Sequence, residues 1–225
     1  MDRRVRPGRI ANVLMQIDAD IVALQEVLSI EGSSREKDQA RFLAEELGFH
    51  YAFGETRQLN GGNYGNVILS RFPIQVDRNY DITRPGCEKR GCLRTDIQVN
   101  GTTIHVFNVH FGTAFQEHRQ QARHLFDHGI VSDDELQGSR IVLGDFNEWA
   151  RGSVTRTLKK HLAHADMRKH LRRSRTYPGV LPLFTLDHIY FDRELKLESL
   201  HLHTTRPALV ASDHLPLFAD FRKPA

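Results

Sequence analysis

The stretch Ile141-Val142-Leu143-Gly144-Asp145-Phe146-Asn147 is the most informative part of this 225-residue chain, because an apolar run ends there on a carboxylate and an amide two residues apart. Four other short apolar runs carry an acidic residue, a histidine or an asparagine at or near their ends; they are residues 21–26, 106–110, 184–190 and 212–217. Such groups are costly to bury without partners. Strands that repeatedly finish on them predict a polar cluster at one edge of a sheet, most simply a metal-assisted active site.

Length and composition favour one soluble domain. With 40% hydrophobic residues and no shift in composition along its length, the chain can bury a sizeable core, so we expect a single domain over residues 1–225. The formal charge of +3 favours an anionic partner only weakly. No apolar run reaches the roughly 20 residues of a membrane span, and the first eight residues contain no signal-peptide core. We therefore expect a cytoplasmic protein, a monomer by default.

The two cysteines, Cys87 and Cys92, are too few for a disulfide framework. They also lack the four-ligand spacing of a structural zinc site. We interpret them as free thiols in a reducing compartment.

Hydrophobic periodicity predicts many strands and a few helices. A helix is expected over 9–18, followed by a buried strand over 20–27, and a second helix over 38–47 that stops at Gly48. Asn100-Gly101 predicts an antiparallel hairpin between strands 95–99 and 103–109. The other expected helices are 115–128 and 154–171, and the other expected strands are 66–70, 140–143, 186–191, 195–203 and 217–221. This order predicts stacked sheets flanked by helices.

Two clusters have competing interpretations. Gly61 to Gly65 contains three glycines, which can cradle a phosphate, but it precedes a strand, so we interpret it as a hairpin turn. His161, His164 and His170 fall in the predicted helix over 154–171, and we interpret them as part of a solvated basic face, not as a zinc site.

The acidic and amide groups suggest a charged reaction centre. Glu26 ends a predicted buried strand, where it needs a partner, and a hard cation such as magnesium is one candidate. Asp145 and Asn147 can point into one pocket as a base or water-positioning carboxylate and a neutral donor. An Asx turn is the alternative for this pair, although it accounts less easily for both residues.

Two Asp-His pairs supply imidazoles. Asp187-His188 opens an aromatic strand and Asp213-His214 follows Ser212. An aspartate that accepts a proton from one imidazole nitrogen fixes the tautomer, so that the histidine can act as an acid or a base near neutral pH. A serine triad built on Ser212 is disfavoured, because no Gly-x-Ser-x-Gly turn is present.

Taken in order, these motifs closely resemble those of the endonuclease/exonuclease/phosphatase superfamily, of the small bacterial metal-dependent hydrolase type. The motifs are Ala-Asp-Ile-Val-Ala-Leu-Gln-Glu-Val, Gly-Asn-Val-Ile-Leu-Ser-Arg-Phe-Pro-Ile, Asn-Val-His-Phe, Leu-Gly-Asp-Phe-Asn-Glu, Leu-Asp-His-Ile-Tyr and Ser-Asp-His-Leu-Pro-Leu. The resemblance runs from about Arg9 to Phe221. It implies an α+β fold, the four-layer αββα sandwich of DNase I-like proteins, and cleavage of phosphate esters that depends on magnesium, with manganese as the alternative metal.

The resemblance also assigns roles by position. It implies that Glu26 binds the metal with Asp213 nearby, and that Arg90 and Asn147 contact the substrate phosphate. The implied catalytic residues are His110, Asp145, Asn147, Asp187 and His214, with Asp187 orienting His214.

One part of the family pattern has no counterpart. Family members open with a central strand that carries an asparagine beside the metal, and Met1 to Gly8 supply neither. We therefore expect the fold to lack its usual first central strand, because the sequence is truncated at its N-terminus or because the protein has lost that strand. Losing it would expose two sheet edges.

We expect in-line attack of water on a phosphodiester, with Asp145 or His214 as the base and His110 steadying or protonating the leaving group. The choice between the two bases stays open. With no long basic stripe, the chain favours a small or lipid-derived phosphodiester over nucleic acid, and nuclease activity is the alternative. A catalytically silent binding protein that lacks the first strand is the third hypothesis.

Overall fold

The computed structural model describes residues 6–133, 135–149, 152–171 and 174–222. Its helices are α1 (Pro7–Ile17), α2 (Gln39–Leu47), α3 (Phe115–Asp127), α4 (Ser153–His161), α5 (Met167–His170) and α6 (Ala208–Ala211). Its strands are β1 (Ile21–Ser29), β2 (His50–Leu59), β3 (Gly62–Ser70), β4 (Ile74–Asp81), β5 (Gly91–Val99), β6 (Thr102–His110), β7 (Ser139–Asp145), β8 (Ala163–His164), β9 (Asp187–Phe191), β10 (Lys196–Leu202) and β11 (Leu217–Arg222). Among the described residues, no helix is long and apolar enough to cross a membrane.

The first sheet has three antiparallel strands in the order β1-β3-β2. The turn between β2 and β3 is Asn60-Gly61, where both residues have positive φ, 50° and 78°. This pair suits the tight hairpin turn that needs left-handed residues. The predicted hairpin is therefore confirmed, but its bounds were wrong: β3 already begins at Gly62, and Gly65 lies in the strand, where a Cβ would stand 2.0 Å from the carbonyl oxygen of Gly54.

The second sheet has six strands in the order β4-β5-β6-β7-β9-β8. The Asn100-Gly101 hairpin joins β5 to β6 with Val99 opposite Thr102, as predicted. Strand β6 runs parallel to β7, and β9 runs antiparallel to β7. The C-terminal ends of β6 and β7 therefore lie beside the N-terminal end of β9, which is the edge where the predicted site residues occur.

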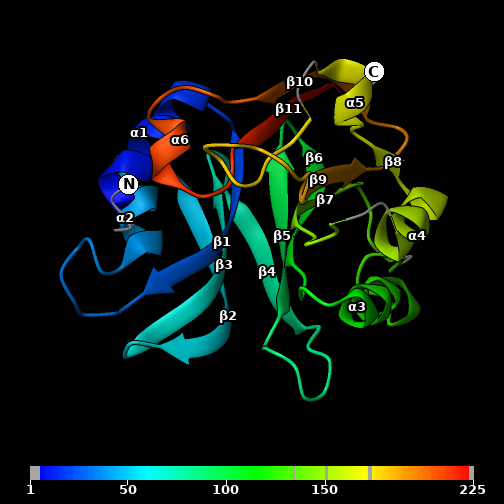
Figure 1. The fold of residues 1–225 in the computed structure, drawn as a ribbon, viewed down its shortest axis with the longest axis horizontal. Coiled ribbons are helices and arrows are strands. Elements are labelled where there is room, and N and C mark those ends of the chain that lie inside the picture. Colours follow the sequence, from blue (N-terminus) through cyan, green and yellow to red (C-terminus); the bar gives the residue numbers. More distant parts are fainter. Residues whose placement is uncertain (1–5, 134, 150–151, 172–173, 223–225) are drawn as a thin grey trace.

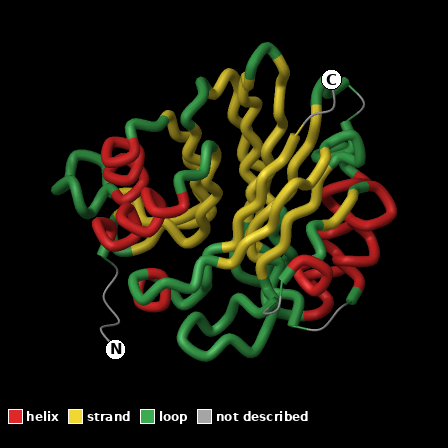
Figure 2. The backbone as a smooth tube through the Cα atoms, turned by 90° about the horizontal axis from the view of Figure 1, so that it is seen from above, coloured by secondary structure: helices red, strands yellow, loops and turns green. Residues whose placement is uncertain are grey.

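The sheets pack face to face and helices cover their outer faces (Figures 1 and 2). Between the sheets lies a core that includes Ile68, Leu93 and Val106. Helices α1 and α2 pack on the first sheet, while α3 and α4 cover the six-stranded sheet through a second core that includes Phe107 and Leu158. This layering confirms the predicted α+β class with helices outside and sheets inside.

The layer that contains the first sheet is divided. Strands β10 and β11 pair only with each other, and they pack on the same six-stranded sheet through a core that includes Leu200 and Ile189. Within residues 6–222, the first element of the chain is α1, and no strand of the described part joins β1 to the β10–β11 pair. In the described residues, β1 and the β10–β11 pair therefore form separate parts of this layer.

The split sheet also corrects one prediction about burial. The strand over 20–27 was expected to be buried, but in β1 only Val27 is buried and most other side chains are partly exposed. A strand with an unpaired edge leaves both its backbone groups and its flanking side chains open to solvent. The apolar sequence of β1 is typical of an interior strand, but among the described residues β1 pairs with β3 alone and is an edge strand.

Both N-terminal helices begin and end as the sequence indicates. Pro7 occupies the first turn of α1, where its missing N–H costs nothing. Asp38 caps α2 by accepting the backbone N–H of Arg41, and Gly48 ends the helix with a φ of 68°.

The predicted helix over 154–171 is wrong as a single element. Helix α4 ends at His161, the chain then pairs with β9 through β8, and α5 is one short turn. Consequently His164 does not lie on a solvated helix face: its ring stacks on Tyr190, with centroids 4.6 Å apart, and its Nε2 lies 3.2 Å from Nδ1 of His188. Helical spacing of basic residues did not reveal this strand.

A buried ionic triad joins β5 to β6. Arg94 donates two hydrogen bonds to Asp96, at 2.8 and 2.6 Å, and His105 Nδ1 lies 2.7 Å from the same carboxylate. Burial disfavours the charged carboxylate, but the hydrogen bonds from His105 and Arg94 outweigh it and lower the pKa of Asp96 to about 2.

We expect Asp96→Ala to lower the free energy of unfolding by about 3 kcal/mol, because it leaves Arg94 buried without its partner. Lys89→Ala is the control, since it removes an exposed pair with Asp81 and should change stability by less than about 1 kcal/mol. Chemical denaturation of both variants measures the difference. Because the pKa of Asp96 is depressed, its contribution is complete above about pH 4 and is lost as pH falls toward 2. An equal loss in both variants would contradict the prediction.

The two cysteines are free thiols, as predicted, and their surroundings differ. Cys87 is exposed, whereas Cys92 lies in β5 within the core under α3 and α4 and has no exposed surface. Burial raises the pKa of the Cys92 thiol well above its usual range.

Candidate active site

Three adjacent strands place a histidine and two aspartates in one row. His110 is the last residue of β6 and stands opposite Asp145, the last residue of β7. Asp145 in turn stands opposite Asp187, the first residue of β9. Backbone pairing therefore brings together three of the predicted catalytic residues that are far apart in the sequence.

His214 completes this row from the segment between α6 and β11. Its Nδ1 lies 2.8 Å from Oδ2 of Asp187, and its Nε2 lies 3.8 Å from Oδ2 of Asp145. The same Asp145 oxygen lies 3.8 Å from Nε2 of His110. One carboxylate thus stands between two imidazoles, and Asp187 orients the imidazole of His214.

The neighbouring charges shift the pKa values of these groups in different directions. Burial raises the pKa of Asp145 to about 7, and the negative charge of Asp187 acts in the same direction. Burial opposes the charged form of His214, but the hydrogen bond and charge of Asp187 outweigh it and raise its pKa to about 9. Burial and the positive charge of Arg90 lower the pKa of His110 to about 3. At neutral pH, His214 is charged and His110 is neutral.

Asn147 holds the loop that follows β7. It has a φ of 47°, a left-handed conformation that asparagine tolerates better than most residues. Its backbone N–H donates to Oδ1 of Asp145 at 2.8 Å, and its side-chain amide donates to the carbonyl of Phe111 at 2.9 Å. The Asx turn considered for this pair is therefore present, and Asn147 still lies beside the carboxylate. Its contact with a substrate phosphate stays a prediction.

Glu26 lies at a bulge in β1. The pairing register shifts between Leu24 and Val27, and Glu26 itself has a φ of 60°. Asn108 of the opposite sheet explains the position of this bulge, since its buried amide donates to the carbonyls of Leu24 and Val67 at 2.8 and 2.9 Å. A bulge re-aims a side chain.

The exposed Glu26 carboxylate acts on residues of both sheets. Its charge, together with burial, raises the pKa of Tyr64 on β3, and it also contributes to the raised pKa of Asp145. Glu26 thus belongs electrostatically to the same site as the row formed by β6, β7 and β9.

Arg90 is close enough to His110 for its charge to lower the pKa of that imidazole. Its side chain is only 8% exposed and donates to Glu88 at 2.8 Å, while its buried Nε has no hydrogen-bond partner among the residues that the structure describes. Glu88 also pairs with Arg57. A buried guanidinium with an unused N–H suits an anionic ligand, and its contact with a substrate phosphate stays a prediction.

The carboxylates suit a hard cation, although no protein cage for one is present. Within residues 6–133, 135–149, 152–171 and 174–222, no three His, Cys, Asp or Glu side chains are placed to hold a metal together. Magnesium, however, is often bound by one or two carboxylates and several waters. Glu26 and Asp213 are both exposed, and the charge of Asp213 also reaches His214. These oxygen donors fit such a water-rich site.

Some residues of the site were not predicted. Tyr177 packs its ring against His214, with centroids 4.9 Å apart, and Asn108 sets the bulge that carries Glu26. The alternation of β6, which puts Asn108 on the face of His110, was the available signal for Asn108. Ser212, considered for a serine triad, is exposed, and its hydroxyl accepts the backbone N–H of His214 at 3.1 Å.

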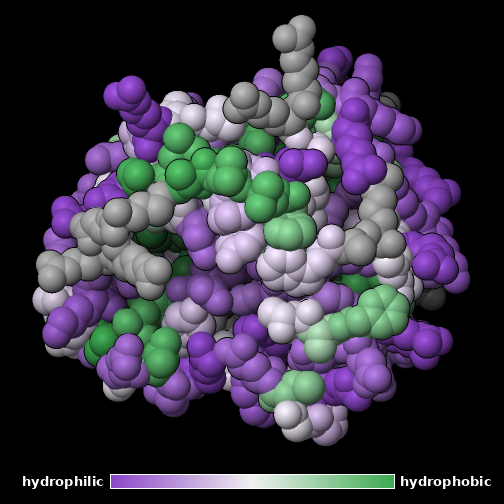
Figure 3. Space-filling view, in the orientation of Figure 1, coloured by the Kyte–Doolittle hydropathy of each residue, from purple (hydrophilic) through white to green (hydrophobic). Residues whose placement is uncertain are grey.

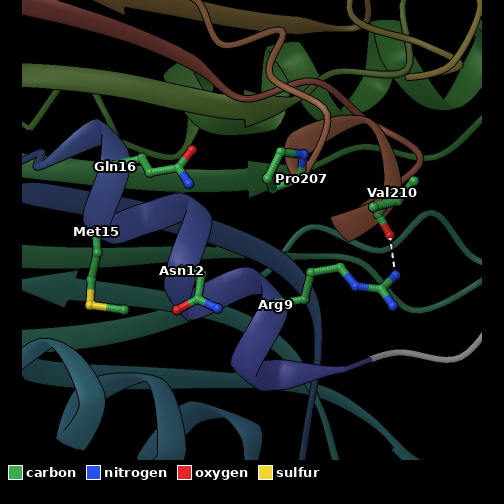
Figure 4. A pocket seen from close by; sticks show the side chains of 6 residues that line it. All are labelled: Arg9, Asn12, Met15, Gln16, Pro207 and Val210. Carbon is green, nitrogen blue, oxygen red and sulfur yellow. Dashed lines mark hydrogen bonds between the residues drawn. The ribbon is translucent and has the colours of Figure 1, made fainter.

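One surface hollow lies away from this row. It has a volume of about 620 Å³ between α1 and α6, and Arg9 crosses it to donate to the carbonyl of Val210 at 2.7 Å (Figure 4). Its other lining residues are Asn12, Met15, Gln16 and Pro207. Because it contains neither the imidazoles nor the carboxylates of the row, it is not the reaction centre.

The fold is a sandwich of two sheet layers between helices, with a polar site at the strand ends. This architecture places the protein in the DNase I-like class. The chain belongs to the Endonuclease/Exonuclease/phosphatase family, whose model matches residues 2–214. This family consists of hydrolases that include phosphatases and nucleases.

Known proteins resemble the chain over most of its length. The uncharacterized protein YbhP of Escherichia coli K12 is 32% identical over 235 residues, which cover 97% of this chain and 89% of YbhP. A family member from Bacteroides vulgatus has a TM-score of 0.78 at 18% identity, covering 98% of this chain and 91% of its own. A mannosyl-6-phosphatase from Bacteroides thetaiotaomicron has a TM-score of 0.77 at 18% identity, covering 96% and 90%. At these identities the structures support the fold alone.

Proposed function

We propose that the protein is a magnesium-dependent phosphodiesterase that cleaves a small or lipid-derived phosphodiester by in-line attack of water. The observation that carries the proposal is the Asp145 carboxylate placed 3.8 Å from each of two imidazoles, one of which is oriented by Asp187. Membership of a hydrolase family supports the reaction class. His214, which is charged at neutral pH, supplies positive charge for the phosphoryl group.

Different residues of the site would accept and donate the protons of the reaction. Asp145, with a pKa of about 7, can accept a proton from water near neutral pH, which favours it over His214 as the base. His214, with a pKa of about 9, carries a positive charge there and can stabilise the phosphoryl oxygens or protonate the leaving oxygen. His110 is neutral, so its ring N–H can steady the phosphate but is a poor acid.

The atoms of the reaction balance without a further reactant. The water oxygen forms a new bond to phosphorus while one ester P–O bond breaks. The water proton taken by Asp145 is matched by the proton given to the leaving oxygen. The products are an alcohol and a phosphomonoester.

Glu26, with Asp213 as the second carboxylate, would hold the metal ion through oxygen atoms and waters. When bound, magnesium or manganese would supply positive charge to the phosphoryl and leaving oxygens. Arg90, whose charge acts on His110, would supply a second positive group for the phosphate.

Hydrolysis of bis(p-nitrophenyl) phosphate tests this function. We expect turnover with magnesium that excess EDTA abolishes and that added magnesium restores. Magnesium binding without turnover would support the alternative of a silent binding protein. EDTA-resistant turnover that persists after dialysis would contradict the metal requirement.

The pH dependence tests the roles of the two charged groups. If Asp145 must be deprotonated, activity rises as pH increases through about 7. If His214 must be protonated, activity falls as pH increases beyond about 9. A profile of kcat/KM against pH should therefore be bell-shaped. A profile that is flat from pH 6 to about 10 would contradict the assignment of Asp145 as the base.

A further inference from the structure

An exposed apolar surface lies beside the proposed active site. Five large hydrophobic side chains gather there with high exposed fractions: Leu181 67%, Val180 55%, Leu183 48%, Trp149 44% and Phe184 37%. They make up half of the exposed large hydrophobic residues in the described ranges. We name residues 177–184 together with Trp149 the apolar loop. Figure 3 shows hydrophobic surface over the region where Figure 1 draws α6 and the yellow-orange segment ahead of β9.

The apolar loop is closed at its base. Tyr177 and Phe184 face each other in an antiparallel bridge, with hydrogen bonds of 3.1 and 2.8 Å between their backbones. Trp149 packs edge-on against Phe184 and Tyr177, with ring centroids 4.8 and 5.8 Å apart. The chain is therefore held in a fixed shape while its tip, from Val180 to Leu183, stays exposed.

The same loop is fastened to the segment that carries His214. Gly179 donates its N–H to the carbonyl of Asp213 at 2.6 Å, and Leu215 donates to the carbonyl of Thr176 at 2.9 Å. These hydrogen bonds fix the position of the tip relative to His214. Any surface that binds the tip is therefore held at a set distance from His214. Exposed apolar patches rimmed by polar residues mark interaction sites.

We infer that the apolar loop docks on the surface of a phospholipid bilayer and presents the active site to the phosphodiester of lipid headgroups. The substrate part of this inference rests on the proposed function, whereas the docking part does not. The tip is aliphatic, and aliphatic side chains bury readily among acyl chains but offer no aromatic face on which a nucleobase stacks. Trp149 and Tyr177 lie behind the tip, as aromatic residues do at the level of headgroups.

Charge complementarity selects the lipid. Arg175 is exposed two residues before the loop begins at Tyr177, and the sequence carries three arginines within residues 172–175. Basic residues next to an apolar tip are attracted to anionic headgroups. The expected occupant is therefore a bilayer that contains an anionic phospholipid such as phosphatidylglycerol.

Trp149 is the only tryptophan in the chain, so its fluorescence reports directly on this surface. The test adds vesicles to the whole protein in EDTA, which prevents turnover. One set of vesicles contains phosphatidylcholine alone and the other contains phosphatidylcholine mixed with phosphatidylglycerol. We expect a blue shift of Trp149 emission and cosedimentation of the protein, both stronger with the anionic vesicles.

A matched pair of double variants locates the contact. Leu181→Gln with Leu183→Gln should lower the partition coefficient at least about tenfold. Phe115→Gln with Met15→Gln replaces side chains of nearly equal exposure, 66% and 47%, that lie outside the apolar loop, and should bind vesicles as the wild type does. Circular dichroism and melting confirm that both variants are folded.

Several results would overturn the inference. They are an unchanged Trp149 spectrum with wild-type protein, equal binding by the two double variants, a response to a single-stranded oligonucleotide in place of vesicles, or a stable dimer whose formation buries Trp149. Hydrolysis of bis(p-nitrophenyl) phosphate without vesicle binding would refute docking and leave the proposed function standing. Vesicle binding without hydrolysis of any diester would support docking and refute the proposed function.

Discussion

Asp145→Asn should lower the turnover of bis(p-nitrophenyl) phosphate by about two to four orders of magnitude. The substitution keeps an oxygen that can accept the N–H of Asn147, so the loop after β7 should keep its shape. It removes the group that accepts the proton from water, between His110 and His214. Steady-state kinetics with saturating magnesium measures the loss.

Asp77→Asn is the control for Asp145→Asn, because Asp77 is exposed on β4 and has no place in the site. Its turnover should match that of the wild type. Melting curves for both variants separate a loss of chemistry from a loss of fold. Turnover by Asp145→Asn within a few fold of the wild type would contradict the role of this carboxylate.

His214→Ala should lower turnover about a hundredfold or more, because it removes the charged imidazole that Asp187 orients. His201→Ala is the control, since His201 is exposed on β10 and packs on Phe218. Retention of activity in His214→Ala and in Asp145→Asn together would refute the proposed mechanism.

Asp187→Asn separates positioning from chemistry at His214. The hydrogen bond and charge of Asp187 raise the pKa of His214, so their removal should lower that pKa as well as the turnover. An NMR titration of His214 measures the first effect. A lower turnover with an unchanged His214 pKa would indicate that Asp187 acts in another way.

The sequence predicted the site better than it predicted the frame around it. His110, Asp145 and Asp187 were found because each lies at the end of an apolar run, and the register of β6, β7 and β9 then places them opposite one another. Glu26 was found in the same way. The bulge that exposes it was not, since that bulge depends on Asn108, 82 residues away, from the opposite sheet.

The missed elements share a physical cause. Strands β2 and β4 carry many polar side chains that are exposed or partly exposed, so their apolar signal is weak. The break between α4 and α5 follows from pairing of β8 with β9, which is tertiary and has no local signal. The position of Arg90 and the packing of Tyr177 on His214 likewise depend on contacts between distant segments.

The two cysteines, five residues apart, can report how often the helices separate from the six-stranded sheet. Cys87 is exposed and Cys92 is enclosed beneath α3 and α4. A thiol reagent should therefore modify Cys87 at once and reach Cys92 only when the helices leave the six-stranded sheet. The modification rate of Cys92 would then measure how often this half of the sandwich opens, and no cysteine would have to be engineered.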